Sequence, residues 1–274
     1  MSLFDALKLE RIEVNLFRGR SVDPSVRRIF GGQVIAQALL ASYETVETRL
    51  CHSLHCYFIR PGDPGIPILF NVDRARDGGS FTTRRVTAIQ HGQQIFNLSA
   101  SFQDPEAGLE HQAPMPVVKT PDEALRPRSD PARPPRKPRP VEIRGLDTFG
   151  VRGDIAPRPG TAELWMRAND AIDDDPRAHQ VALAYASDLD LLPVTTRPHG
   201  VDWRLPNFQP ASLDHAMWFH RPVRFSDWHL FSMDSPSASG GRGFVRGQVF
   251  SEDGRLVASV AQEGLIRMRA PRVP

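Results

Sequence analysis

The chain has 274 residues, which is long for one ordinary domain and sufficient for two domains of about 120 residues each. Its 40% hydrophobic and 24% charged residues are typical of a globular protein and exclude wholesale disorder or a collagen-like fibre. The formal net charge is only +2, but the charge and the 25 prolines are unevenly distributed along the chain.

The beginning of the chain carries no recognisable targeting signal. Residues 1–10 lack a basic segment followed by an apolar one, and no stretch reaches the ~18 to 20 uninterrupted apolar residues that a membrane span needs. The two cysteines, Cys51 and Cys56, are too few for a disulfide scaffold and fit a reducing compartment. We therefore expect a cytoplasmic protein without membrane insertion.

The first half of the chain predicts one helix followed by strands. After Gly31-Gly32-Gln33, residues 34–43 carry apolar side chains around most of a helix, so we expect this helix to be wrapped by a sheet. Four strand-like runs follow, and His91-Gly92 supplies the last hairpin turn. These runs are residues 51–60, 66–75, 80–90 and 93–103.

The run from Cys51 to Cys56 reads Cys-His-Ser-Leu-His-Cys and raises the question of a zinc site. In a strand, Cys51 and His55 would point to one face and His52 and Cys56 to the other. Each face would then hold at most half of a tetrahedral ligand set, so we expect no metal here.

A segment rich in proline and arginine divides the chain. Residues 114–140 hold nine of the prolines, and no Phe, Trp or Tyr lies between Phe102 and Phe149. Between Arg126 and Arg139, six basic residues accompany one acid, Asp130, which gives this stretch a charge of +5 and leaves the rest of the chain at −3. The six are Arg126, Arg128, Arg133, Arg136, Lys137 and Arg139.

Such a segment cannot bury a core, and its prolines favour extended geometry, so we interpret it as a linker. A basic arm for nucleic acid or a proline-rich ligand is the alternative, but the segment has no aromatic residue to stack on bases and the remainder of the chain is acidic. The predicted organisation is an N-terminal domain over residues 1–112, a linker over 113–145 and a C-terminal domain over 146–274.

After the linker the same order of elements recurs. A strand at residues 164–168 and an apolar helix at 179–189 precede four strand-like runs, the last of which follows a turn at Asp253-Gly254. The runs are residues 213–220, 228–233, 243–250 and 256–267.

The two halves also match in detail: Gln33-Val34 corresponds to Gln180-Val181, and residues 57–61 correspond to residues 218–222. A helix wrapped by an antiparallel sheet is the hotdog arrangement. We therefore predict an α+β protein of two tandem hotdog domains, a double hotdog.

Four phrases of the sequence carry a resemblance to a known family. Residues 30–39, 52–63, 213–222 and 242–247 resemble the type II acyl-CoA thioesterases, the TesB family, and the resemblance extends over nearly the whole chain except the linker. It implies hydrolysis of a fatty acyl-CoA to free fatty acid and CoA, with no metal or organic cofactor, by an activated water.

The resemblance also implies three catalytic residues. Asp188 ends a Tyr-x-Ser-Asp phrase, Ser212 precedes a Leu-Asp-His-x-Met-Trp phrase, and Gln262 begins Gln-Glu-Gly. A thioester carbonyl is already electrophilic, so hydrolysis needs a placed water, an acceptor for its proton and donors for the oxyanion. Asp188 can accept the proton while Ser212 and Gln262 hold the water.

Other interpretations remain open from the sequence. Ser212 could be a covalent nucleophile, although Ala211-Ser212-Leu213 lacks the glycines of a Gly-x-Ser-x-Gly elbow. An enoyl-CoA hydratase or dehydratase of hotdog type would need an Asp/His pair, and a non-catalytic acyl-CoA-binding protein would bind without turnover.

The sequence also offers residues of undecided role. Arg60 and Arg221, each before a proline, could contact CoA phosphates or form structural ion pairs. His52, His55, His215 and His220 lie on or beside strands and fit core or interface positions, or the border of a thioester channel. Because hotdog sheets usually pair edge to edge, we expect a homo-oligomer.

Overall fold

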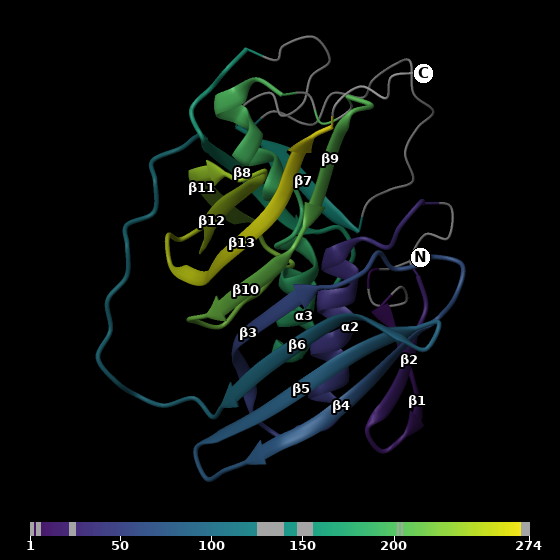
Figure 1. Ribbon diagram of the computed structural model, residues 1–274. Helices are drawn as coiled ribbons and strands as arrows, with labels where there is room; N and C mark the ends of the chain where they lie inside the picture. Colours follow the sequence, from purple (N-terminus) through teal and green to yellow (C-terminus); the bar gives the residue numbers. More distant parts are fainter. Residues whose placement is uncertain are drawn as a thin grey trace, which may run out of the picture.

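A computed structural model describes residues 3, 7–21, 26–124, 140–146, 156–201, 203 and 205–269. In these residues, 13 strands form one antiparallel sheet that curves around two helices, α2 and α3 (Figure 1). The elements before the linker are β1 (Leu9–Glu13), β2 (Leu16–Gly19), α2 (Gly31–Tyr43), β3 (Leu50–Phe58), β4 (Ile68–Asp77), β5 (Phe81–Gln90) and β6 (Gln93–Gln103).

The second half repeats this order with two additions, a 3-10 helix and a short strand. Its elements are β7 (Val141–Gly145), β8 (Thr161–Ala168), α3 (Pro176–Ala186), the 3-10 helix η1 (Leu192–His199), β9 (Phe208–Ser212), β10 (Asp214–Phe219), β11 (His229–Ser239), β12 (Arg242–Ser251) and β13 (Leu256–Met268). Strand β9 lies off the main path of the sheet and pairs with β13.

The strand order is a mirrored repeat. It runs β1-β2-β4-β5-β6-β3 in the first half and continues as β10-β13-β12-β11-β8-β7 in the second. The halves meet where β3 pairs with β10, with Tyr57 opposite Asp214 and Ser53 opposite Trp218. The predicted double hotdog is confirmed, and the matching strands β3 and β10 are the ones that join the two sheets into one.

The two helices fill the inside of the curved sheet and pack against each other. Eleven residues of α2 are buried, as its apolar circumference predicts. Helix α3 begins where Asp175 caps Arg177 N and Pro176 fixes the first turn. It ends at Ala186 rather than continuing to residue 189, so Asp188 lies in the turn that follows the helix.

A buried hydrogen-bonded cluster joins the C-terminal end of α2 to the second half. The Tyr43 hydroxyl donates to Gln180 Oε1 on α3 and accepts from Cys51 N on β3, at 2.8 Å. Gln180 Nε2 donates in turn to Cys51 O at 3.0 Å. Because these polar groups are buried, the contact fixes how the two helices and β3 sit together.

The expected alternation in the Cys-His segment is wrong. The register of β3 against β6 shifts between Cys51 and Ser53, so Cys51 and Cys56 are both buried on the inner side while His55 is exposed. Burial raises the pKa of both thiols. Among the described residues, no group of three or more His, Cys, Asp or Glu side chains is arranged to hold a metal ion.

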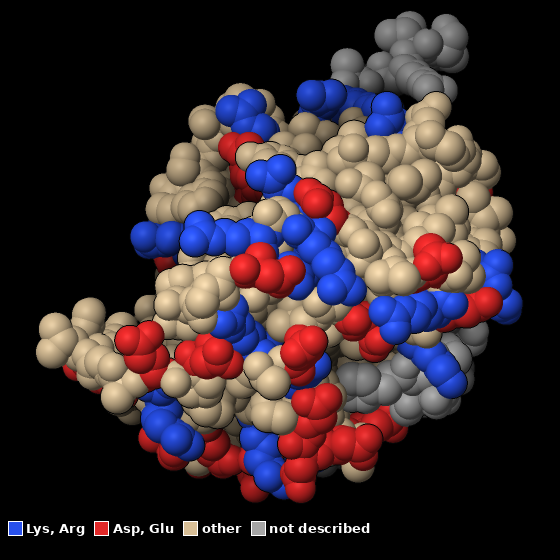
Figure 2. Space-filling model, turned by 90° about the horizontal axis from the view of Figure 1, so that it is seen from below, with Lys and Arg blue, Asp and Glu red and all other residues tan. Residues whose placement is uncertain are grey.

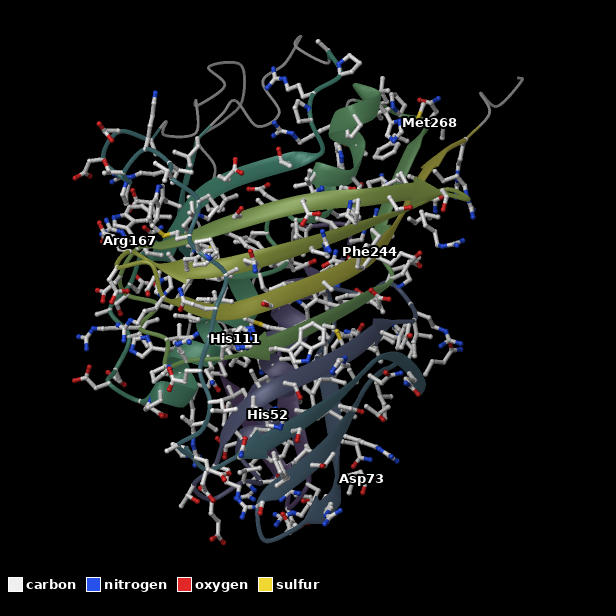
Figure 3. The ribbon with its side chains drawn as sticks, turned by 90° about the vertical axis from the view of Figure 1, so that its left-hand side faces the viewer. His52, Asp73, His111, Arg167, Phe244 and Met268 are labelled. Carbon is white, nitrogen blue, oxygen red and sulfur yellow. The ribbon has the colours of Figure 1, made fainter. Side chains whose placement is uncertain are left out.

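The chain after β6, which includes His111, crosses the outer face of that part of the sheet formed by the second half of the chain (Figure 3). Gln112 donates to Gly254 O at 2.9 Å and accepts from Leu256 N at 3.1 Å, and Trp165 Nε1 donates to Lys119 O. Within the residues proposed as linker, 113–145, the last five form β7 on β8. The basic run from 126 to 139 lies outside the described residues.

Candidate active site

Asp188 lies in the turn after α3 and faces the first turn of α2. Its Oδ2 accepts a hydrogen bond from Gly32 N at 3.0 Å. The carboxylate therefore sits at the positive end of a helix from the other half of the chain, a favourable position for a negative charge.

In the described part of the chain no helix could span a membrane.

Ser212 reaches the same point from the last position of β9. Strand β9 pairs with β13, with Ser212 opposite Gly264, and Leu213 N donates to Glu263 O. The Ser212 hydroxyl donates to Asp188 Oδ1 at 3.3 Å. The short strand that the sequence did not predict is thus the element that holds this hydroxyl beside the carboxylate.

Gln262 is fully buried on β13, two residues from the Ser212 pairing position. Its Nε2 donates to Ser212 Oγ at 2.8 Å. Asp188, Ser212 and Gln262, which are spread over 75 positions of sequence, therefore form one hydrogen-bonded cluster. The structure brings together all three residues that the resemblance implied.

The environment tunes the acidity of the carboxyl group. Burial raises the pKa of Asp188 from 3.8 to about 6, while hydrogen bonds from Gln262, Gly32 and Ser212 lower it. A base with a pKa close to neutral is ionised at pH 7 and still accepts a proton readily. This is the property that general-base activation of water requires.

Two glycines make room for the carboxylate. A Cβ on Gly31 would lie 2.7 Å from Asp188 Oδ2, and one on Gly32 would lie 2.3 Å from the Tyr185 carbonyl oxygen. The Phe30 and Tyr185 rings meet edge to face beside them, with centroids 5.2 Å apart. The Gly-Gly pair therefore permits close approach of the two helices at the site.

Sequence reasoning assigned no specific role to His215, which the structure places next to the cluster. His215 points inward from β10 and is 1% exposed. Its Nδ1 lies 2.6 Å from Gln262 Oε1 and its Nε2 lies 2.9 Å from Ser187 Oγ. The sequence signal that could have identified His215 was its position three residues after Ser212, on a strand that pairs with β13.

The other residues of undecided role lie in structural contacts. His52 and His220 contact Ser101 and Ser259, and Arg60 donates to Gln94 O. Arg221 donates to Leu256 O at 2.9 Å and lies 3.8 Å from the Glu110 carboxylate. These contacts fit a structural role for both arginines.

Basic and acidic side chains are interspersed on the face shown in Figure 2 rather than gathered by sign. Ion pairs also join basic and acidic side chains within the described residues, as between Arg18 and Glu10 and between Arg49 and Asp104. A nucleic-acid interface requires a concentrated basic surface, and this face does not provide one.

Comparison with known proteins links both halves to one family. Residues 152–265 match the model of the acyl-CoA thioesterase family, and residues 21–103 match that of the acyl-CoA thioesterase N-terminal domain. Acyl-CoA thioesterase 2 of Haemophilus influenzae is 40% identical over 97% of both chains. Human acyl-coenzyme A thioesterase 8 is 38% identical over 96% of this chain and 88% of its own length.

Solved structures agree. The acyl-CoA thioesterase II TesB2 of Mycobacterium marinum is 40% identical, with a TM-score of 0.83 over 98% of this chain and 99% of that one. A tesB protein of Mycobacterium avium subs paratuberculosis is 31% identical, again with a TM-score of 0.83, over 97% of this chain and 100% of that one. The chain therefore belongs to the acyl-CoA thioesterase family and is a thioester hydrolase with a double hotdog fold.

Proposed function

We propose that Asp188, Ser212 and Gln262 hydrolyse a fatty acyl-CoA through one activated water. The observation that carries this proposal is the chain of hydrogen bonds from Gln262 Nε2 to Ser212 Oγ, 2.8 Å, and from Ser212 Oγ to Asp188 Oδ1, 3.3 Å. It gathers an acceptor of suitable pKa, a hydroxyl and an amide at one point.

The reaction follows from these groups. Asp188 takes a proton from the water as the water oxygen attacks the thioester carbonyl carbon, and the carbonyl oxygen gains the negative charge. The second N–H of the Gln262 amide and the remaining lone pair of Ser212 Oγ orient the water, and backbone N–H groups at the first turn of α2 favour negative charge nearby. When the carbon–sulfur bond breaks, the proton held by Asp188 passes to the CoA thiolate, which leaves a free acid and CoA.

A hydratase is disfavoured because the nearby histidine is already engaged on both sides. His215 is 1% exposed, its Nδ1 contacts Gln262 and its Nε2 contacts Ser187. Because both ring nitrogens are engaged by protein groups, Asp188 and His215 do not form the Asp/His pair that hydration of a double bond needs.

The test is a thiol-release assay over saturated acyl-CoAs of increasing chain length, with wild type and Asp188→Asn. We expect wild type to release thiol and the variant to lose about 100- to 10,000-fold in kcat. A hydratase cannot cleave a saturated thioester, and a binding protein would bind it without turnover. Undiminished hydrolysis by Asp188→Asn would refute the site, and no hydrolysis at any chain length by wild type would refute the function.

We also propose that the protein is a homo-oligomer that uses the outer face of the sheet. Tyr57 is 60% exposed there, Phe81 43% and Leu69 38%, on β3, β5 and β4. Exposed apolar side chains on the outer face of a sheet are available for contact with another subunit. Light scattering should give a multiple of the 30.6 kDa chain mass, and Tyr57→Lys should lower it. A monomeric wild type would contradict this.

We propose a cytoplasmic location on the basis of the two free cysteines, Cys51 and Cys56, which are buried and unpaired with each other. Cytosolic thiols stay reduced. Cell fractionation that places the protein with a cytoplasmic marker enzyme would support this, and recovery in a secreted or membrane fraction would contradict it.

A further inference from the structure

A continuous line of hydrogen bonds runs from Ser187 through His215, Gln262 and Ser212 to Asp188. Ser187 Oγ contacts His215 Nε2 at 2.9 Å, and His215 Nδ1 contacts Gln262 Oε1 at 2.6 Å. Gln262 Nε2 then contacts Ser212 Oγ, which contacts Asp188 Oδ1. Ser187, His215 and Gln262 are each at most 1% exposed, so water does not compete for these contacts.

The proton positions along this line follow from the charge on Asp188. An ionised carboxylate only accepts, so the Ser212 hydroxyl must donate to it. Ser212 Oγ must then accept from the Gln262 amide nitrogen, which turns the amide oxygen toward His215. That oxygen only accepts, so His215 Nδ1 must carry the hydrogen. The bare Nε2 then takes the single Ser187 hydroxyl hydrogen in place of Ala184 O, which lies 2.9 Å from the same Oγ.

All four donors therefore point toward Asp188, and bonds aligned in this way strengthen one another. Burial lowers the pKa of His215 from 6.5 to about 4, while its hydrogen bond with Gln262 raises it. The ring is thus neutral at pH 7, with one donor and one acceptor nitrogen. Beyond His215, the only titratable group of this line is Asp188. Cys56 lies opposite His215 on β3, and burial raises the pKa of its thiol.

The amide of Gln262 has two orientations that fill the same space. With its oxygen toward Ser212, it would accept the hydroxyl hydrogen that Asp188 needs, and the hydroxyl would no longer fix the carboxylate. A donor at His215 Nδ1 favours the productive orientation, because the reversed amide would place its NH₂ group against that N–H.

We propose that His215 is a positioning residue that locks the Gln262 amide, and through it Ser212, in the orientation that lets Asp188 activate water. This proposal rests on the proposed function of Asp188, Ser212 and Gln262. His215 touches no reacting atom and exchanges no proton with the substrate. Its contribution is the geometry of the three residues that do.

Two substitutions separate positioning from packing. In His215→Asn the side-chain nitrogen can take the place of Nδ1 and donate to Gln262, whereas in His215→Gln the longer amide reaches toward the place of Nε2 and Ser187. We expect His215→Asn to keep kcat within about threefold of wild type and His215→Gln to lose about 10- to 100-fold, with KM changed less than about threefold in both. His220→Phe, an exposed position just after β10, is the control.

The coupling to Gln262 is tested by His215→Phe alone and combined with Gln262→Ala. His215→Phe should lower kcat about 10- to 100-fold in the wild-type background and cause no further loss when Gln262 is already Ala. Thermal unfolding shows whether each variant is folded. If His215→Phe is not folded, the comparison of His215→Asn with His215→Gln tests the positioning role.

Equal kcat values for folded His215→Asn and His215→Gln, or additive losses in the double variant, would overturn the positioning role while Gln262→Ala still impairs hydrolysis. If Gln262→Ala and Asp188→Asn both retain wild-type kcat, it is the proposed function that fails. The two failures are therefore distinguishable within one set of proteins.

Discussion

The backbone N–H of Gly32 donates a hydrogen bond to the carboxylate of Asp188, at 3.0 Å, although 156 residues separate the two. Gly32 lies in the first turn of α2, the helix of the first hotdog, and Asp188 follows α3, the helix of the second. The site is thus built across the junction of the two halves, and neither half contains it alone. The three proposed catalytic residues lie after the linker, but the groups that surround the carboxylate do not.

Substitution of the two adjacent glycines should have different effects. A Cβ on Gly31 would meet Asp188 Oδ2 and the Phe58 ring, which are side-chain atoms that can shift. We expect Gly31→Ala to displace the carboxylate and lower kcat/KM about 100-fold, with the melting temperature close to that of wild type. A Cβ on Gly32 would press on the Tyr185 backbone, so Gly32→Ala should unfold at a lower temperature.

Gly108→Ala is the matched control, because a Cβ there meets nothing within 4 Å. Steady-state thiol release and thermal unfolding of the three variants check the prediction. Wild-type activity in Gly31→Ala would show that the carboxylate does not need its observed position against α2.

The rate should depend on the protonation of Asp188. Its pKa of about 6 means that the base is lost as pH falls through 6, so kcat/KM should decrease about tenfold per pH unit below that value. The measurement is kcat/KM for one saturated acyl-CoA between pH 4.5 and 8. Asp188→Asn, measured in parallel, should show no such limb. A wild-type profile that is flat down to pH 4.5 would contradict Asp188 as the base.

Most of the fold could be predicted because its signals are local and repeated. The apolar circumference of α2 and the turn residues His91-Gly92 and Asp253-Gly254 indicated the elements, and the repeat indicated two hotdogs. The strands that were missed are short or weakly patterned. Strand β9 contains Pro210, and β7 lies in the proline-rich segment assigned to the linker.

The site was predictable only in part, for a physical reason. Asp188, Ser212 and Gln262 were identified by resemblance to a family, since no spacing rule connects a turn after α3 with two strands, β9 and β13, that pair far from it in sequence. The role of His215 was not predictable, because it depends on which face of β10 turns inward and on the atoms 2.6 Å and 2.9 Å away. A pattern of residue types does not encode such contacts.

Hydrolysis should require a hydroxyl group at position 212, whether serine or threonine supplies it. Ser212 accepts from Gln262 and donates to Asp188, and threonine supplies the same two functions. We expect Ser212→Thr to keep kcat within about threefold and Ser212→Ala to lose about 10- to 100-fold while retaining measurable hydrolysis. Mass spectrometry of the wild type during turnover should find no acyl group on Ser212. A trapped acyl-serine would instead establish a covalent route.

The stability of the protein should respond to pH through Asp188 and His215 in opposite directions. The folded pKa of Asp188 is raised to about 6, so its burial as a charge destabilises the fold above that pH, and this cost disappears as pH falls toward 3.8. The folded pKa of His215 is lowered to about 4, so stability is lost as pH falls from 6.5 toward 4 because the unfolded chain binds the proton.

Asp188→Asn removes the first contribution and keeps the second. It should therefore be more stable than wild type at pH 7, and that advantage should shrink as pH falls below 6 and vanish only toward pH 3.8. Melting temperatures at pH 7, 6 and 5 check this, with Asp73→Asn on the exposed side of β4 as the control for removing a surface carboxylate. A constant difference between Asp188→Asn and wild type would mean that the Asp188 pKa is not raised.

The Tyr43 hydroxyl should stabilise the fold without affecting catalysis. It bonds to Gln180 and Cys51 N in a buried cluster at the opposite end of α2 from Gly32. Tyr43→Phe leaves both partners short of a bond and should cost about 1 to 3 kcal/mol of unfolding free energy, or several degrees in melting temperature. Tyr57→Phe, at a 60% exposed position, should change neither stability nor kcat. Equal melting temperatures for the two variants would show that the buried cluster does not hold the halves together.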